Sequence, residues 1–260
     1  MANNNYNTQG VIGTRSLNGL PNKNVPFVFV DLVLTLEEKQ MLTDFRVDKC
    51  EALYYIEKRN ATEEFFQASY CEENLKKIST NPSEEGLKSV CSVIDQLKKD
   101  FVRDIDELCH SRGAGGLDFS TLDYNIDSNK GTEGERPFWH LDSTSYSEKV
   151  CILEENTFSL VTDLKGNYNT WFYNATETER NRLGNGPSGL QHLFPTDSKS
   201  DKVVSAKAFH GTYFEDGSAV HAVPCIGTDS DERIFMGMSA ACVDVERYVC
   251  PGATPVYSEV

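Results

Sequence analysis

The sequence predicts an α+β fold in which a helical segment packs against a β-rich core. An apolar stripe with helical spacing runs through residues 87–108, and short runs of alternating polarity begin near residue 117. Glycine, asparagine and aspartate separate those short runs, as turn residues separate strands. The chain has 260 residues, of which 39% are hydrophobic and 25% charged, so it can bury one sizeable core.

The N-terminal residues 1–24 are polar and lack periodicity, and we expect a disordered tail ahead of a single domain over 25–260. This segment has neither the basic nor the apolar stretch of a signal peptide, so no secretion signal is expected. The run 25–34 (VPFVFVDLVL) predicts a strand. It falls well short of the roughly 20 residues that a membrane-spanning helix needs, and no membrane association is expected.

Helices are predicted over about 35–112. The stretch 35–38 (TLEE) has the pattern of a capping box and predicts a helix that runs to about residue 60. A second helix is expected over about 62–79. The third is the clearest, because its apolar residues recur every three or four positions: Leu87, Val90, Cys91, Ile94, Leu97, Phe101, Ile105 and Leu108.

The following part, about 117–250, predicts an all-β sandwich or barrel. The expected strands are 117–126, 137–142, 150–153, 157–163, 168–174, 203–209, 213–215, 219–224 and 233–243. The polar stretch 174–202 lies between two of these strands, and a short helix is expected within it at 176–183. Insertions of this length are often functional, so we interpret 174–202 either as a lid over the core or as a solvated loop.

Charge and cysteine usage limit the partners and the compartment. The net charge of −15 makes nucleic acid an unfavourable partner, because an acidic surface repels phosphates. The eight cysteines form no C-x-x-C pair, and most of them fall at apolar positions, so we expect buried free thiols rather than disulfides. Free thiols together with the missing secretion signal predict a cytoplasmic protein. No feature predicts the oligomeric state.

The segment FWHLDST, residues 138–144, carries the first pattern that indicates chemistry. Residues two apart on a strand share a face, so His140 and Asp142 are expected to point the same way. They could be two polar residues on an exposed strand, although the apolar residues around them disfavour exposure. An imidazole and a carboxylate directed into a β core are two of the three ligands in a facial triad that binds Fe(II), and zinc or nickel could replace iron there.

A second histidine would complete such a triad. His110 closes the long helix, where a histidine suits the helix dipole, and His192 lies in the polar insertion. His210 precedes a glycine at a strand end, whereas His221 lies in the apolar run GSAVHAVP. Sequence spacing alone does not choose between His210 and His221.

Arg233 opens the otherwise apolar run RIFMGMSAAC, residues 233–242. A buried arginine needs an anionic partner, and its planar fork matches a carboxylate with two parallel hydrogen bonds. That partner is either the carboxylate of a bound molecule or an acid of the chain, such as Asp231 or Glu232.

These motifs in this order, H-x-D, then G-x-x-V-H-x-V-P, then an arginine, resemble the Fe(II)/2-oxoglutarate-dependent dioxygenases. The resemblance covers about 117–243. It implies a double-stranded β-helix (jelly-roll) core with the helical layer packed on one sheet. It also implies that Fe(II) is held by His140, Asp142 and His221, and that the co-substrate 2-oxoglutarate is held by Arg233.

The resemblance further implies an oxygenase that hydroxylates a small molecule, an amino acid or a peptide side chain while 2-oxoglutarate is decarboxylated to succinate. Some members carry a serine two residues after the arginine, where this chain has Phe235, and Tyr124 on the upstream strand is a possible replacement. Phe138, Trp139 and Thr144 flank the ligands and are expected to contact substrate.

Two alternatives stay open on the sequence. The chain could be a cupin-type metal dioxygenase or isomerase that does not use 2-oxoglutarate, in which Arg233 would be structural. It could also be a jelly-roll binding module without catalysis.

Overall fold

The computed structural model describes residues 17, 21–22, 24–47, 51–53, 68–79, 82–129, 137, 139–142, 145–147, 150–154, 156–166, 170–184, 194–196, 199–222, 233–243 and 247–248. The expected tail over 1–24 lies almost entirely outside the described residues. A strand near the start of the chain, β1 (Phe27–Asp31), lies within the run for which it was predicted.

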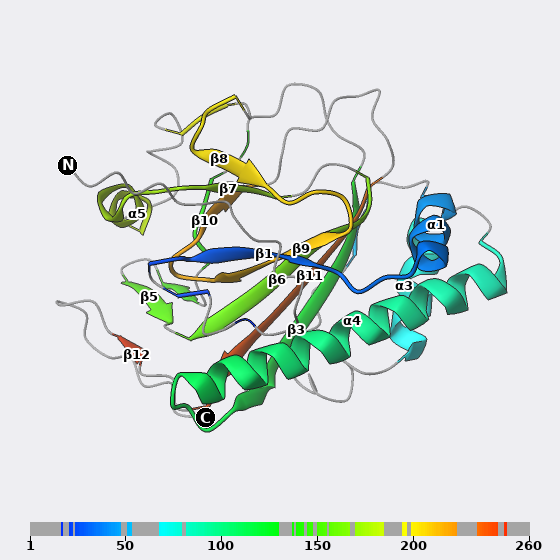
Figure 1. The fold of residues 1–260 in the computed structure, drawn as a ribbon, viewed down its shortest axis with the longest axis horizontal. Coiled ribbons are helices and arrows are strands. Elements are labelled where there is room, and N and C mark those ends of the chain that lie inside the picture. Colours follow the sequence, from blue (N-terminus) through cyan, green and yellow to red (C-terminus); the bar gives the residue numbers. More distant parts are fainter. Residues whose placement is uncertain are drawn as a thin grey trace.

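A six-stranded antiparallel sheet forms the larger wall of the core (Figure 1). Its strands, in spatial order, are β1, β9 (His210–Glu215), β6 (Thr157–Lys165), β11 (Arg233–Cys242), β3 (Leu117–Asn129) and β2 (Glu51–Leu53). The N-terminal strand β1 pairs with β9 at one edge of this sheet, which ties the start of the chain to the β core.

A smaller sheet faces the large one. It contains β10 (Val220–Ala222), β7 (Trp171–Tyr173) and β8 (Val203–Ser205), and a backbone bridge between His140 and His221 adds the segment 139–142 to it. Phe172 of the small sheet packs against Phe27 and Phe214 of the large sheet, so the inner faces of the two sheets meet.

The chain passes back and forth between the two sheets. After β3 in the large sheet it enters the segment 139–142 in the small one, returns in β6, and later crosses again from β9 to β10 to β11. This exchange between two facing antiparallel sheets is the arrangement of a jelly roll. A third small sheet is not paired with either of these; its order is β12 (Arg247–Tyr248), β5 (Val150–Glu154) and β4 (Ser145–Ser147).

The described helices are α1 (Leu36–Asp44), α3 (Ala68–Ile78), α4 (Glu84–Ser111) and α5 (Glu177–Gly184). The capping box is confirmed, since the Thr35 backbone N–H donates to Glu38 at 2.7 Å and Glu38 N–H donates to the Thr35 hydroxyl at 3.2 Å. Within the described part of the chain, no helix combines the length and the apolar character needed to cross a membrane.

The prediction that the first helix continues to about residue 60 is wrong. The helix ends at Asp44, Phe45 is extended, and β2 pairs with β3 over residues 51–53. Phe45 and Val47 are buried in the core, and Val47 forms a bridge with Ser79. Strand pairing and burial therefore outweigh the weak preference of these residues for a helix.

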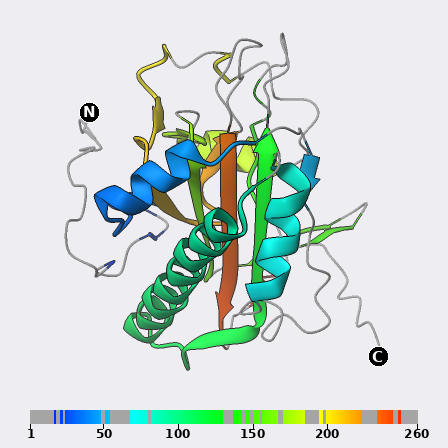
Figure 2. The same cartoon turned by 90° about the vertical axis from the view of Figure 1, so that its right-hand side faces the viewer.

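The long helix α4 crosses the outer face of the large sheet over β3 and β11 (Figure 2). Its buried residues continue the predicted apolar stripe, and the ring of Phe101 stacks on Tyr213 of β9 with centroids 6.1 Å apart. On β11, Ile234, Met236 and Met238 point to this face and join the same apolar core. The alternate residues of β11 consequently point inward, toward the small sheet.

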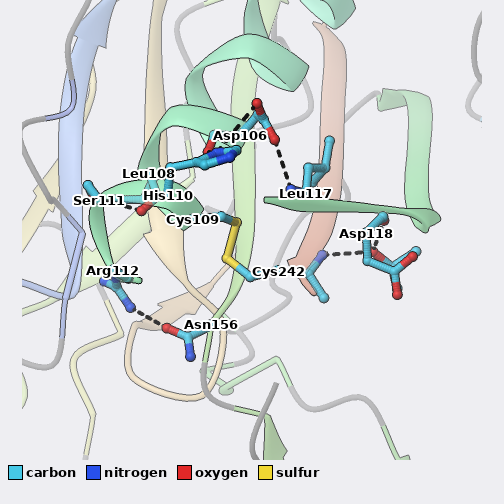
Figure 3. The surroundings of a disulfide bond; sticks show 12 residues. Asp106, Leu108, Cys109, His110, Ser111, Arg112, Leu117, Asp118, Asn156 and Cys242 are labelled. Carbon is cyan, nitrogen blue, oxygen red and sulfur yellow. Dashed lines mark hydrogen bonds and ion pairs between the residues drawn. A yellow bond between two sulfur atoms is a disulfide. The ribbon is translucent and has the colours of Figure 1, made fainter. Parts of the chain in front are cut away.

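A disulfide joins the end of α4 to the end of β11 (Figure 3). It links Cys109 to Cys242, and both residues are buried, so the prediction of free thiols is wrong for this pair. Sequence patterns could not pair two cysteines 133 residues apart, because their proximity comes from the packing of α4 on the sheet. The expected cytoplasmic location rested partly on free thiols, and this disulfide removes that support. Cys71 and Cys91 are free and buried, as predicted.

Candidate metal centre

Two histidines from distant parts of the chain face each other on the inner side of the small sheet. His140 N–H donates to the carbonyl of His221 at 2.9 Å, and His221 N–H donates to the carbonyl of His140 at 3.0 Å. Their ring centroids are 4.2 Å apart. The backbone bridge therefore fixes the separation of the two imidazoles.

Asp142 completes the cluster, because it shares a face with His140. Its Oδ1 lies 3.5 Å from His140 Nε2, and its Oδ2 lies 3.4 Å from His221 Nε2. One donor atom from each residue lies within 4.8 Å of the others, and nowhere else in the described structure are three histidine, cysteine or acidic side chains so close together. The exposed fractions are 7% for His221, 28% for His140 and 39% for Asp142, so the cluster opens toward solvent on the side of Asp142.

The orientation of His221 suits a metal ligand. Its Nδ1 lies 3.0 Å from the carbonyl oxygen of Ala219, which can only accept a hydrogen bond, so Nδ1 carries the proton. The lone pair of the neutral ring then lies on Nε2, which is the nitrogen that faces Asp142. The rings of Phe172 and Phe214 pack on this imidazole, with centroids 5.7 Å and 4.8 Å away, and restrict its rotation.

The chemistry of these donors fits a divalent metal ion. Two neutral imidazoles and one carboxylate on one side of an ion leave its other coordination positions for other molecules, which is the facial arrangement of non-heme Fe(II) enzymes. Because the Asp142 carboxylate lies within 3.5 Å of both imidazoles, the three residues need little rearrangement to become ligands of one ion.

Arg233 is buried on the inner face of the large sheet. Its Nε donates to Asp163 Oδ1 at 2.8 Å, and the two side chains are 2% and 0% exposed. The ring of Phe235 lies beneath the guanidinium, 4.9 Å from Cζ. The acids considered from the sequence, Asp231 and Glu232, lie outside the described residues.

The guanidinium has more donors than its described neighbours use. Arginine carries five N–H donors, and a single hydrogen bond, the one to Asp163, joins Arg233 to the described residues. Nη2 is buried without a hydrogen-bond partner among them. A buried donor without an acceptor is unfavourable, so the site fits a ligand that brings carboxylate oxygens to the Nη groups.

Asp163 was missed in the sequence, although a signal was present. It lies in the strand TFSLVTDLK, where an acid among apolar residues must be paired if it is buried. The pattern did not show which cation it meets, because that depends on the register between β6 and β11.

Tyr124 does not lie beside Arg233, and the prediction that it supports the co-substrate carboxylate is not upheld by this geometry. Tyr124 is paired with Met238, so its side chain points to the outer face of the sheet, whereas Arg233 points inward. There it is buried beneath α4, with Lys98 Nζ 3.6 Å from the centre of its ring. Met238 lies five positions after Arg233, and an odd separation along a strand puts two side chains on opposite faces.

Trp139 also points away from the histidine–aspartate cluster, because it precedes His140 on the same extended segment. It is fully buried on the outer side of the small sheet, where it packs against Tyr173 and Phe194, and its indole N–H donates to the carbonyl of Pro195 at 2.9 Å. The structure thus gives Trp139 a role in the core in place of the predicted contact with substrate. Phe138 and Thr144 lie outside the described residues.

The described parts of the insertion 174–202 cover this outer side of the small sheet. Phe194 and Pro195 pack on Trp139, and α5 lies over Tyr173, whose hydroxyl donates to Glu179 at 3.2 Å. A lid role over the opening of the core remains a prediction for the insertion.

The other two described histidines take no part in the cluster. His210 begins β9, and its Nε2 lies 2.6 Å from Asp31 Oδ1 on the neighbouring strand β1. His110 ends α4, with its Nδ1 2.8 Å from the carbonyl of Asp106. His192 lies outside the described residues. The structure thus brings His221 to His140 and Asp142, a choice that spacing alone left open.

No protein-family model and no curated protein matches this chain. Among solved structures it is similar to the Kdo hydroxylase KdoO, a non-heme Fe(II) alpha-ketoglutarate-dependent dioxygenase, with 12% identity over 83% of this chain and 79% of that one, and a TM-score of 0.43. The carbocyclase SnoK from nogalamycin biosynthesis has 12% identity over 85% of this chain and 81% of its own, with a TM-score of 0.41. A prolyl-4-hydroxylase from Pseudomonas putida has 12% identity over 70% and 83%, with a TM-score of 0.38. Likenesses this distant assign no family, so any function for the chain rests on the geometry of its own residues.

Proposed function

We propose that this chain is an Fe(II)- and 2-oxoglutarate-dependent oxygenase. The observation that carries the proposal is that His140, Asp142 and His221 cluster on one inner wall of a jelly roll while a buried arginine with unused donors, Arg233, lies on the facing wall. One group of residues suits a divalent metal and the other suits a carboxylate.

The residues have distinct roles in this proposal. His140, Asp142 and His221 would hold Fe(II), and the bound iron would supply the activation of O₂ that couples decarboxylation of 2-oxoglutarate to hydroxylation of a C–H bond. Asp142 contributes the one negative charge of the set. Arg233 would hold the carboxylate of 2-oxoglutarate that lies farther from the metal.

One wall beside the cluster is apolar and excludes water. Phe172 and Phe214 are fully buried against His221, so one side of the metal position is apolar. The more exposed side, near Asp142, is where we propose that substrate enters. A small molecule, an amino acid or a peptide side chain is the proposed substrate class, with Phe138 and Thr144 as proposed contacts.

Anaerobic titration of Fe(II) and then 2-oxoglutarate, followed by visible absorption, tests the proposal. We expect a charge-transfer band only when metal and co-substrate are both present. Arg233→Lys should weaken 2-oxoglutarate binding by at least about tenfold and leave Fe(II) binding unchanged, because lysine keeps the charge but loses the planar fork. Arg112→Lys is the matched control, since Arg112 is also paired with a buried acid, Glu215, at 3.0 Å.

A cupin-type metal enzyme that does not use 2-oxoglutarate is the second candidate. One observation favours it, namely that Arg233 already has an anionic partner in Asp163. Metal binding without any response to 2-oxoglutarate would support this candidate and exclude the oxygenase. If neither metal nor 2-oxoglutarate binds, the jelly roll is a binding module.

A further inference from the structure

We infer that Asp163 is a positioning residue for Arg233 and that its charge limits how tightly the site holds the co-substrate carboxylate. This inference rests on the proposed function and deepens it, because it adds a residue that determines affinity at the same site.

The position of Asp163 follows from the pairing of β6 with β11. Asp163 is opposite Phe235 in the register, and an irregularity between Ile234 and Phe235 shifts the pairing just before it. From there its carboxylate reaches the Nε of Arg233 at 2.8 Å. Asp163 and Arg233 therefore point to the same inner face of the sheet from neighbouring strands.

This contact holds the guanidinium from one edge and leaves the rest of it available. Asp163 accepts from Nε, and Phe235 supports one flat face of the group. Nη2 is buried and lacks a hydrogen-bond partner among the described residues, so it is available to a ligand. A group fixed at one edge and one face has little rotational freedom left, so it loses little conformational entropy when it binds a carboxylate.

The charge of Asp163 acts in the opposite direction. Without a ligand, the buried pair has no net charge, which avoids an isolated cation in the core. When a carboxylate of the co-substrate binds Arg233, its negative charge lies near the negative charge of Asp163. Asp163 therefore has two opposite effects: its hydrogen bond orients Arg233 for a carboxylate, and its negative charge repels that carboxylate.

Two substitutions separate orientation from charge. Asp163→Asn removes the charge but keeps an oxygen that accepts from Nε, so we expect it to bind 2-oxoglutarate about tenfold more tightly than the wild type. Asp163→Leu has a similar size and is also uncharged, but it offers no acceptor. We expect it to bind about tenfold more weakly than Asp163→Asn, because the guanidinium is no longer held at Nε.

Calorimetric titration into the protein loaded with Fe(II) under anaerobic conditions measures these affinities. The same titration with 2-oxobutyrate, which lacks the distal carboxylate, should give equal affinities for wild type and variants. Fe(II) affinity should also stay unchanged. Asp216→Asn is the control, since Asp216 is another buried acid of the core, with its Oδ1 hydrogen-bonded to Ser159 at 2.7 Å.

The outcomes separate this inference from the proposed function. If the wild type loaded with Fe(II) binds no 2-oxoglutarate, the oxygenase proposal fails and the role of Asp163 fails with it. If the wild type binds 2-oxoglutarate and Asp163→Asn binds it with the same affinity or more weakly, only the inference is overturned. Equal changes for 2-oxobutyrate and for Asp216→Asn would show a general structural effect and would also overturn it. If Asp163→Leu does not fold, the comparison of Asp163→Asn with the wild type still shows whether the charge of Asp163 limits 2-oxoglutarate affinity.

Discussion

The two faces of the six-stranded sheet use the same strands for different purposes. On β11, Met236 and Met238 point outward into the apolar core beneath α4, whereas Arg233 points inward to a buried ion pair with Asp163. On β9, Tyr213 packs outward against Phe101, whereas its neighbour Phe214 packs inward against His221. Alternation along each strand thus places the larger apolar core on the outer face, and the buried ion pair together with the aromatic residues beside His221 on the inner face.

This division has an energetic reason. Burying the charges of Arg233 and Asp163 costs free energy that their mutual attraction does not reliably recover. The outer face offsets this cost with large apolar side chains that are almost fully buried beneath α4. Substitutions on the outer face should therefore change stability, and substitutions on the inner face should change binding.

The largest effect is expected from the inner face. Asp142→Ala removes the only charged ligand of the proposed triad and should weaken Fe(II) binding by at least about 100-fold, with loss of any oxygenase activity. The melting temperature should change little, because the Asp142 side chain is 39% exposed. Metal titration and thermal unfolding measure the two quantities.

Asp201→Ala serves as the control for Asp142→Ala, since Asp201 is an exposed acid away from the cluster. If both variants bind Fe(II) like the wild type, the histidine–aspartate cluster does not hold the metal. The inner face would then have no role in metal binding to set against the packing role of the outer face.

On the outer face, Phe101→Ala should have the opposite profile. Phe101 is fully buried and stacks on Tyr213, so its truncation should lower the free energy of unfolding by about 3–5 kcal/mol. Fe(II) affinity of the folded protein should stay within about twofold of the wild type. Denaturant unfolding gives the first value and metal titration at low temperature the second. A loss of metal affinity without a loss of stability would mean that the faces are not independent.

The disulfide also belongs to the outer face, because Cys242 points the same way as Met238. Replacing both Cys109 and Cys242 by alanine should lower the free energy of unfolding by about 2–4 kcal/mol, since the bond closes a long loop in the unfolded chain. A reducing agent should lower the melting temperature of the wild type but not that of the double variant. If all eight cysteines of the denatured wild type react with a thiol reagent before reduction, the bond does not form.

The sequence predicted best what depends on local patterns. The capping box at Thr35 and the stripe of α4 follow from the spacing of polar and apolar residues, and the structure confirms them. Most of the expected strands are also present, but 137–142 forms only a bridge at His140, and β4 was not predicted. Side-chain alternation also placed His140 and Asp142 on one face correctly, because the local extended backbone alone sets the relative direction of two side chains two residues apart.

What the sequence missed depends on contacts between distant segments. The pair Cys109–Cys242, the partner of Arg233 and the burial of Trp139 under Pro195 all arise where segments far apart in the chain meet. Tyr124 was misplaced because its face relative to Arg233 is set by the register of β3 on β11. Register is a tertiary property, and composition does not specify it.

The smallest expected effect comes from the outer side of the small sheet. It tests whether residues on that side also affect stability without affecting metal binding. On its outer side, Glu179 accepts from Thr176 N–H at 2.7 Å and from Lys202 Nζ at 3.1 Å. Burial raises the pKa of Glu179, but these hydrogen bonds and the charge of Lys202 outweigh burial and lower it from 4.5 to about 2. Its contribution to stability is therefore complete above pH 4.5 and is lost as the pH falls toward 2.

Glu179→Gln should lower the free energy of unfolding by about 0.5–1 kcal/mol at pH 7, and the difference from the wild type should shrink below pH 4.5. Glu177→Gln, an exposed change in the same helical turn, should show neither effect, and Fe(II) affinity should not respond to either substitution. A change in Fe(II) affinity with Glu179→Gln alone would instead show that the insertion communicates with the metal centre through the small sheet.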